Sequence, residues 1–154
     1  MINHWDKMYI DMATRVAMES KCPRTQVGCV VLLPSGLLAT GINGFPAGQE
    51  EWWNDGSVSN PLVTHAELNA LGKCLEQGVS AKDATVYLTL APCLECSKLL
   101  VRAKVSRVVY KDSYRCLDGV EYLQRYGVLT EQFKPALPPT PEFAYRYTDQ
   151  LARN

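Results

Sequence analysis

Two short segments carry side chains that could hold a metal ion and move a proton. Residues 64–67 read Thr-His-Ala-Glu, and residues 91–96 read Ala-Pro-Cys-Leu-Glu-Cys. His65, Cys93 and Cys96 together offer one imidazole and two thiolates, a donor set that suits zinc. A zinc ion held by three side chains keeps its fourth position for water, whereas a structural site closes that position with a protein ligand. The pattern therefore favours a catalytic zinc site.

Glu67 indicates that the predicted metal site is the active site of an enzyme. It lies two positions after His65, from where its carboxylate could reach a water molecule on the metal. Zinc lowers the pKa of its water to ~7, and the combination H-x-E with P-C-x-x-C uses a glutamate that is not a ligand as general acid and base. Each motif alone is common, since a glutamate early in a helix also complements the helix dipole. Their order, with each motif before a predicted helix, favours catalysis.

The other cysteines leave an alternative open. Cys22, Cys29, Cys74 and Cys116 are possible fourth ligands that would close the site. Each lies in or beside an apolar segment, which favours small buried packing residues. The second histidine, His4, belongs to a predicted amphipathic helix.

The first third of the chain predicts a helix and a hairpin. An apolar stripe at three- and four-residue steps predicts a helix that buries this stripe and ends before Pro23; its residues are Trp5, Met8, Tyr9, Met12 and Val16. The β-branched run 27–33 and the segment 37–42 flank a Pro-Ser-Gly turn. They predict an antiparallel hairpin.

The middle of the chain predicts the elements that would carry the two motifs. After Thr64, an apolar side formed by Leu68, Leu71 and Leu75 predicts a helix that Gly78 can stop. A strand at 85–90, a helix with Pro92 in its first turn and a strand at 107–110 fit a parallel crossover. A last helix is predicted around Val120 and Leu123, before Gly127. We therefore expect a three-layer α/β fold with a mixed sheet.

Two segments lack a regular pattern. Loops as long as residues 43–61 are usually functional or disordered, and Trp52 with Trp53 argues against disorder. Four prolines between 135 and 141 exclude regular structure there, and a peripheral helix is predicted at the end of the chain. We expect one domain over 1–154, with its core at about 5–130 and a proline-rich extension at 135–154.

The composition of the chain argues against two classes of partner, nucleic acids and membranes. Sixteen Lys and Arg residues balance 16 Asp and Glu residues, and the cations are scattered. This argues against a nucleic-acid partner, which requires a concentrated positive field. The N-terminus is unlike a signal or transit peptide, and no apolar run approaches the ~18 residues of a membrane span. We expect a cytoplasmic protein without a membrane partner, in the host cytoplasm if the source is viral.

At these motifs the chain resembles the cytidine and deoxycytidylate deaminase superfamily, from about Trp5 to Leu129. Residues 20–28 (Ser-Lys-Cys-Pro-Arg-Thr-Gln-Val-Gly) are similar to the segment that opens deoxycytidylate deaminases. Residues 41–48 (Gly-Ile-Asn-Gly-Phe-Pro-Ala-Gly) are similar to their glycine-asparagine-glycine loop, an arrangement of phage and bacterial members. Cys22 stands where the family usually has aspartate.

The resemblance implies a cytidine-deaminase-like α/β/α fold with a five-stranded mixed sheet. It implies that His65, Cys93 and Cys96 bind Zn2+ and that Glu67 moves the protons. It also implies further substrate contacts: Asn43 to the sugar or base, the Ala66 backbone amide to the pyrimidine, and Arg24, Tyr114 and Ser20 to the 5′-phosphate. A solvated loop cation is the alternative for Arg24, and a half-buried aromatic is the alternative for Tyr114.

The implied reaction is hydrolysis of deoxycytidine monophosphate (dCMP) to deoxyuridine monophosphate (dUMP) and ammonia, which supplies the precursor of thymidylate. The resemblance further implies a homo-oligomer, commonly a hexamer, that responds to dCTP and dTTP with Mg2+. Gly44 and Gly48 would let backbone amides approach phosphates, and Arg115 is a candidate for relaying the effect.

Three other functions compete with this interpretation. A deaminase of adenosine in transfer RNA shares both motifs, but it needs a basic surface that flips the base out. Deaminases of free nucleosides usually have cysteine where His65 stands. A noncatalytic zinc-stabilised binding module would use the same ligands, and Glu67 with an open coordination position argues against it.

Overall fold

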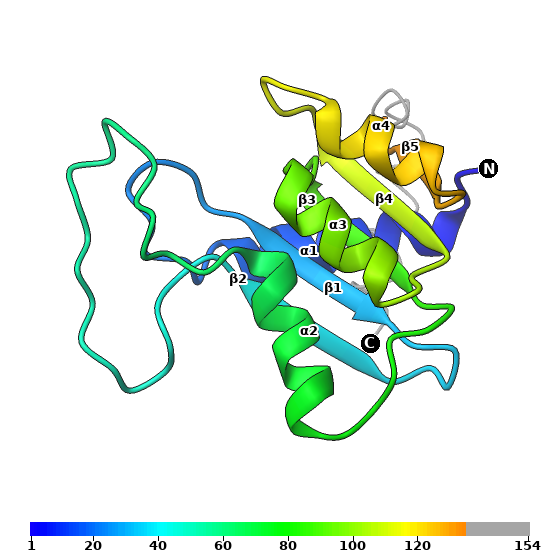
Figure 1. The fold of residues 1–154 in the computed structure, drawn as a ribbon, viewed down its shortest axis with the longest axis horizontal. Helices are drawn as coiled ribbons and strands as arrows, with labels where there is room; N and C mark the ends of the chain where they lie inside the picture. The colour runs from blue at the N-terminus through cyan, green and yellow to red at the C-terminus, as the bar shows by residue number, and fades with distance from the viewer. Residues whose placement is uncertain (135–154) are drawn as a thin grey trace, which may run out of the picture.

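A mixed five-stranded sheet forms the middle layer of the computed structural model, which describes residues 1–134 (Figure 1). Its strands are β1 (Gly28–Leu32), β2 (Leu38–Ile42), β3 (Thr85–Leu90), β4 (Arg107–Asp112) and β5 (Leu129–Gln132). In the order β2-β1-β3-β4-β5, β1 is antiparallel to both of its neighbours, whereas β3, β4 and β5 are parallel. The predicted hairpin, crossover and mixed sheet are confirmed. The residues of β5 were not foreseen, because its sequence Leu-Thr-Glu-Gln has no apolar alternation.

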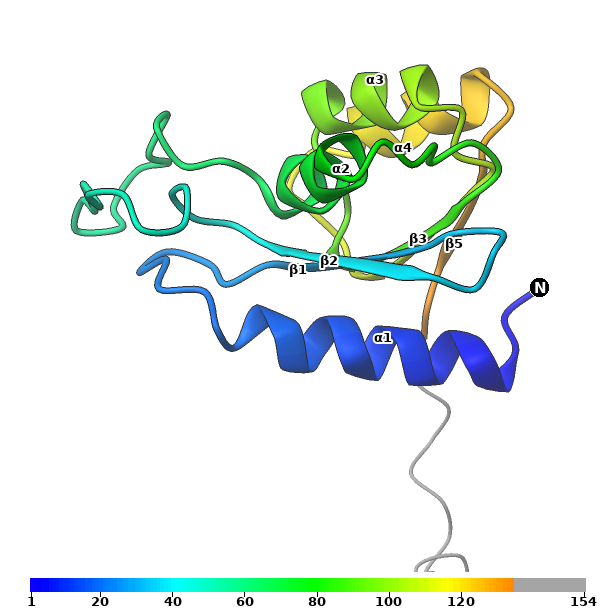
Figure 2. The same ribbon diagram turned by 90° about the horizontal axis from the view of Figure 1, so that it is seen from below.

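Four helices cover the two faces of this sheet, as Figure 2 shows. One face carries α1 (His4–Ala17), and the other carries α2 (Ala66–Glu76), α3 (Leu94–Arg102) and α4 (Asp118–Arg125). This confirms the three-layer prediction. Within residues 1–134, no helix combines the length and the apolar character needed to cross a bilayer. The extension at 135–154 and its predicted terminal helix lie outside the described residues.

Alternating strand residues build the two cores. Val30, Tyr87 and Val109 pack with Ile10 and Ala13 of α1. Their neighbours along the strands pack in the second cluster, against α2, α3 and α4; these include Val31, Val86, Leu88 and Val108. Since successive strand side chains point to opposite faces, a strand covered on both sides is largely apolar, as β1 and residues 86–88 of β3 are.

The predicted apolar stripe of α1 is confirmed only in part, because Tyr9 and Met12 pack against the core as half-buried residues. The buried residues of this helix are Asp6, Ile10, Ala13 and Ala17. Trp5 and Met8, which were expected in the core, are exposed. A buried aspartate explains the difference, because hydrophobic patterning cannot anticipate a carboxylate that finds its partners on distant strands.

Asp6 connects α1 to the sheet through a buried ion pair. Its carboxylate accepts hydrogen bonds from Arg107 Nη1 at 2.6 Å, Arg107 Nη2 at 3.0 Å and the Tyr87 hydroxyl at 2.9 Å. Burial would raise the pKa of Asp6, but the bonds from Arg107, the Asn3 backbone and Tyr87 outweigh it and lower the pKa. Arg107 also pairs with Glu131 of β5 at 2.6 Å. One cluster thus joins α1, β3, β4 and β5.

The buried side of α2 also differs from the prediction. Leu71 is buried, but Leu68 and Leu75 are exposed, and the residues facing the sheet are mostly small. The cause is a close approach of the α2 backbone to β2 at Gly41. A Cβ atom there would lie 2.1 Å from the Ala66 carbonyl oxygen and 2.6 Å from the Ala70 nitrogen. Large side chains therefore cannot stand between α2 and β2.

Replacing Asp6 with alanine should lower the free energy of unfolding by about 3–5 kcal/mol, because Arg107 would lose a buried partner. The loss should lie nearer the lower figure, since Arg107 keeps Glu131. Denaturant unfolding measures it. Asp11→Ala is the matched control on the same helix, because its ion pair with Lys7 is exposed and should contribute little. Equal stability of the two variants would contradict the role of Asp6.

Candidate active site

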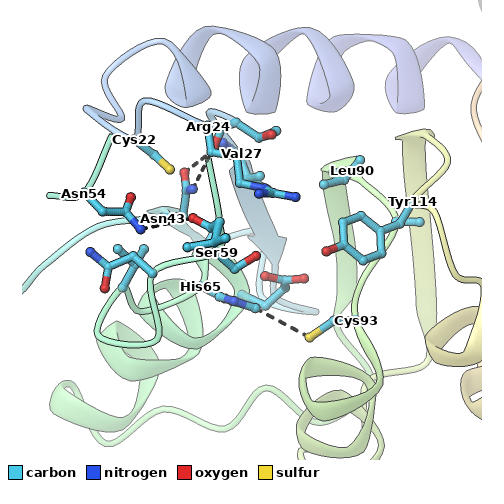
Figure 3. Close-up of a pocket in the computed structure, with 17 residues that line it drawn as sticks. Cys22, Arg24, Val27, Asn43, Asn54, Ser59, His65, Leu90, Cys93 and Tyr114 are labelled. Atoms are coloured by element: carbon cyan, nitrogen blue, oxygen red, sulfur yellow. Dashed lines mark hydrogen bonds between the residues drawn. The ribbon is translucent and has the colours of Figure 1, made fainter. Parts of the chain in front are cut away.

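Three side chains that could bind a metal converge at the N-termini of two helices. His65 immediately precedes α2, Cys93 immediately precedes α3, and Cys96 lies in the first turn of α3. His65 Nδ1 is 3.5 Å from Cys93 Sγ (Figure 3). The same nitrogen is 3.4 Å from Cys96 Sγ. The predicted ligands, 31 residues apart at the widest, are therefore brought together.

The spacing of these atoms fits a tetrahedral zinc ion. With Zn–N at ~2.0–2.1 Å and Zn–S at ~2.3 Å, tetrahedral geometry holds nitrogen and sulfur about 3.5 Å apart. Within residues 1–134, the cluster of possible ligand atoms that lie within 4.8 Å of one another has these three members and no fourth. The chemistry of one imidazole and two thiols also suits zinc rather than the oxygen-binding cations.

The two thiols behave as a coupled pair. A hydrogen bond from the Cys96 thiol, followed by one from His65, lowers the pKa of Cys93 to about 3. The bond to Cys93, together with burial, raises the pKa of Cys96. The pair therefore carries one negative charge readily, and a bound metal would displace the remaining proton.

The remaining cysteines occupy varied surroundings. Cys29 and Cys74 are buried, which confirms the expectation of packing residues for these two. The same expectation was wrong for Cys116, which is exposed, and Cys22 is half-buried on the wall of the pocket described below. None of the four belongs to the cluster of possible metal ligands in the described chain.

The direction of the strands explains why the motifs meet. β2 and β3 are both antiparallel to β1, so their carboxyl ends lie at one edge of the sheet. The chain leaves β3 and reaches Cys93 three residues later. On the other side, Thr64 and Gly44 exchange backbone hydrogen bonds of 2.9 and 3.0 Å, which hold the start of α2 beside the end of β2.

Glu67 lies in the first turn of α2 and is 4% exposed, and its side chain lines the same pocket as His65 and Cys93. Burial raises the pKa of this carboxyl, which partly opposing interactions with the α2 backbone and His65 do not offset. The arrangement places a carboxyl group that can hold a proton beside the candidate metal site.

The pocket extends from this cluster toward the loop that follows β2 (Figure 3). Its walls come from the segments 22–27 and 54–67, the ends of β2, β3 and β4, and the start of α3. The lining residues are Cys22, Arg24, Thr25, Val27, Asn43, Asn54, Val58, Ser59, Asn60, Val63, His65, Ala66, Glu67, Leu90, Ala91, Cys93 and Tyr114. Several loop residues, Ser59 and Asn60 among them, were not predicted. The absence of a regular pattern in residues 43–61 was the available signal.

Asn43 organises the pocket wall that lies opposite the candidate metal ligands. Its Oδ1 accepts hydrogen bonds from the Val27 backbone at 2.8 Å and the Ser20 hydroxyl at 2.7 Å, and its Nδ2 donates to the Thr25 carbonyl at 2.8 Å. Ser20 is 2% exposed and does not line the pocket. The structure thus places Ser20 as a support for Asn43 rather than on the pocket surface.

Arg24, Tyr114 and Ala66, predicted as substrate contacts, all line the pocket. The Arg24 side chain is exposed and donates from Nη1 to the Ser57 carbonyl at 2.9 Å. In Figure 3 the Tyr114 hydroxyl points into the pocket from the side of β4. These positions form a polar rim, and the candidate metal ligands lie on the floor of the pocket.

The residues named for regulation lie outside the lining of the pocket. Gly44, Gly48 and Arg115 are not among its lining residues. Gly44 forms the bridge to Thr64, and Gly48 adopts a positive φ of 73°. The Arg115 guanidinium lies 5.9 Å from the centre of the Tyr114 ring.

Comparison with known proteins agrees with this architecture. The deoxycytidylate deaminase of Saccharomyces cerevisiae is 34% identical over 142 residues, a match that covers 84% of this chain and 45% of the yeast protein. The chain therefore spans about half the length of that relative. The deoxycytidylate deaminase of Mycobacterium phage D29 is also 34% identical, over 69% of this chain and 93% of the phage protein.

A solved structure gives the same result. The dCMP deaminase of cyanophage S-TIM5, crystallised with dCMP and dUMP, superposes with a TM-score of 0.78 at 36% identity, covering 86% of this chain and 99% of that one. The model of the cytidine and deoxycytidylate deaminase zinc-binding region matches residues 3–112, which include both motifs. Because this match spans more than half of the chain, the protein belongs to the cytidine and deoxycytidylate deaminase family.

Proposed function

We propose that this protein hydrolyses dCMP to dUMP and ammonia at a zinc site formed by His65, Cys93 and Cys96. The observation that carries the proposal is the convergence of these donors with the buried Glu67 in one pocket. Its likeness to a phage enzyme whose crystals contain dCMP and dUMP supports this substrate. The product would supply thymidylate synthesis in the cytoplasm.

Zinc bound at this cluster would supply Lewis-acid activation of a water molecule. Glu67 would accept the proton of that water and pass it to N3 of the cytosine ring. As N3 gains this proton, the water oxygen would bond to C4. Glu67 would then carry the second proton of that water to the exocyclic amine, so that the C4–N bond breaks, ammonia departs and a C4 carbonyl remains. Because Glu67 is buried, bulk water does not compete for its proton.

The pocket walls would hold the nucleotide for this reaction. Val27 and Leu90 offer apolar surface to a flat ring, and the Ala66 backbone lies beside the proposed zinc ligands. One N–H of the Asn43 side chain amide is committed to the Thr25 carbonyl, and the second would reach the sugar or base. Ser20 would keep the Asn43 side chain oriented.

Arg24 and Tyr114 would bind the 5′-phosphate at the rim. One Arg24 nitrogen is held by Ser57, and the guanidinium has further N–H donors that can fork onto phosphate oxygens. The Tyr114 hydroxyl adds a neutral donor. This arrangement would favour a nucleotide over a nucleoside, and the neutral net charge of the chain disfavours a large RNA substrate.

Regulation and assembly extend the same proposal. We infer that dCTP and dTTP, with Mg2+, act through the loop 43–61 in a homo-oligomer that is a hexamer. Support comes from the position of this loop, whose residues Asn54 and Ser59 line the pocket, so that a ligand on Gly44 or Gly48 would move a pocket wall. Substrate saturation curves that stay unchanged with each triphosphate would contradict the inference.

Replacing Glu67 with glutamine should abolish turnover while zinc stays bound, because the amide cannot accept and return a proton. One positioned acid–base group contributes ~10²–10⁴-fold, and a group that serves two steps should lie at the upper end. Ammonia release at matched zinc content measures the loss. Cys96→Ala is the contrasting variant, which should lose zinc and turnover together. A loss below about tenfold in Glu67→Gln would exclude Glu67 as the proton carrier.

Replacing Arg24 with alanine should lower kcat/KM for dCMP by on the order of tenfold or more, since charge-assisted hydrogen bonds contribute about 1.5–3 kcal/mol each. Turnover of deoxycytidine, which has no phosphate, should change little. Arg15→Ala is the matched control, because Arg15 is exposed on α1 and pairs with Glu19. Equal losses on nucleoside and nucleotide would mark Arg24 as a structural residue. Assays with single-stranded DNA and transfer RNA on the wild type separate the polymer deaminases.

A further inference from the structure

We propose that Gly119 is a positioning residue for the metal site, because the start of α4 packs directly on the backbone that carries Cys93. A Cβ atom at Gly119 would lie 2.2 Å from the Pro92 carbonyl oxygen and 2.8 Å from the Cys93 carbonyl carbon. Both are backbone atoms, which cannot rotate away as a flexible side chain can. The absence of a side chain at position 119 therefore sets how closely α4 approaches the start of α3.

Ser97 of α3 also packs against Gly119, on the other side of the same contact. Ser97 Oγ would lie 2.7 Å from the added Cβ, and Ser97 is fully buried. Its hydroxyl has no hydrogen-bond partner within residues 1–134, so its small size rather than a polar bond fits it to this position. The α3–α4 contact is thus built from small groups and leaves no room for an extra atom.

Neither side of this contact can move freely. Val120 and Leu123 anchor α4 in the core, and Leu100 anchors α3. An alanine at 119 would therefore push against the turn of Pro92 and Cys93 between β3 and α3, whose backbone atoms are the ones that its Cβ meets. Cys93 would then shift relative to His65, although Gly119 touches neither thiol nor imidazole.

Small shifts matter at a metal site. His65 Nδ1 stands 3.5 Å from Cys93 Sγ, close to the separation that tetrahedral zinc requires. Metal–ligand distances tolerate only about 0.2 Å, and changes to groups that orient ligands typically cost about 10–100-fold in metal affinity. Gly119 would thus act through Cys93. This inference rests on the proposed zinc site, but not on the identity of the substrate.

The test is the rate at which the zinc-loaded, full-length protein releases zinc to a chromogenic chelator. Gly119→Ala should release zinc at least tenfold faster than the wild type. Its Co2+-substituted form should show an altered visible spectrum, because that spectrum reports coordination geometry. If the wild type binds zinc but lacks dCMP turnover, the proposed function fails while this measurement still decides the role of Gly119.

Two control variants separate positioning from general destabilisation. Gly72→Ala adds a methyl group in α2, where no atom lies within 4 Å, and should release zinc as the wild type does. Val120→Ala removes buried volume from α4 without adding an atom beside Cys93. It should lower the melting temperature while keeping zinc release near that of the wild type. Equal zinc release in Val120→Ala and Gly119→Ala would overturn the proposal.

A milder variant covers the case in which Gly119→Ala does not fold. Ser97→Thr adds one methyl group to the same contact from the side of α3 and should also speed zinc release. Wild-type zinc release and an unchanged Co2+ spectrum in a folded Ser97→Thr protein would overturn the proposal as well.

Discussion

The structure depends on one geometric constraint, which is that side chains at two helix N-termini must bring their nitrogen and sulfur atoms within 3.5 Å at a single edge of the sheet. Parallel alignment of β2 and β3 brings both helix starts to that edge, and glycine at the closest backbone approaches lets the helices sit deep enough. Gly41 seats the start of α2 against β2, and Gly119 allows α4 to close on the start of α3. The apolar core fixes the helices, which hold the candidate metal ligands of the two motifs.

Two buried carboxylates show how surroundings divide structural from chemical roles. Asp6 is surrounded by Arg107, Tyr87 and a backbone amide, so its pKa falls and it stays charged as an anchor for α1. Glu67 lies in a pocket where burial raises its pKa. A group that must take up and release a proton benefits from such surroundings. A carboxyl group therefore serves the fold on one face of the sheet and the proposed reaction on the other.

The loop after β2 forms one wall of the pocket. It is held to the segment 20–26 by the Lys21–Glu51 ion pair, the Arg24–Ser57 hydrogen bond and the bonds of Asn43. The Phe45 ring packs edge-on against Trp53 at 4.8 Å. These contacts connect the proposed phosphate-binding rim to the loop, so that the shape of the pocket and the order of the loop depend on each other.

The sequence by itself determined the layers, the mixed sheet and the chemistry of the site, because periodicity and the spacing of His65, Glu67, Cys93 and Cys96 are local properties of the chain. It did not determine the full buried side of α1 or α2, the strand β5, or the other residues of the pocket wall. Asp6 is buried only because Arg107 lies opposite it, and Leu68 is exposed only because the α2 backbone approaches Gly41. Ser20, predicted at the pocket surface, instead supports Asn43. Each of these outcomes depends on partners far away in the chain, and only the packed tertiary structure brings such partners together.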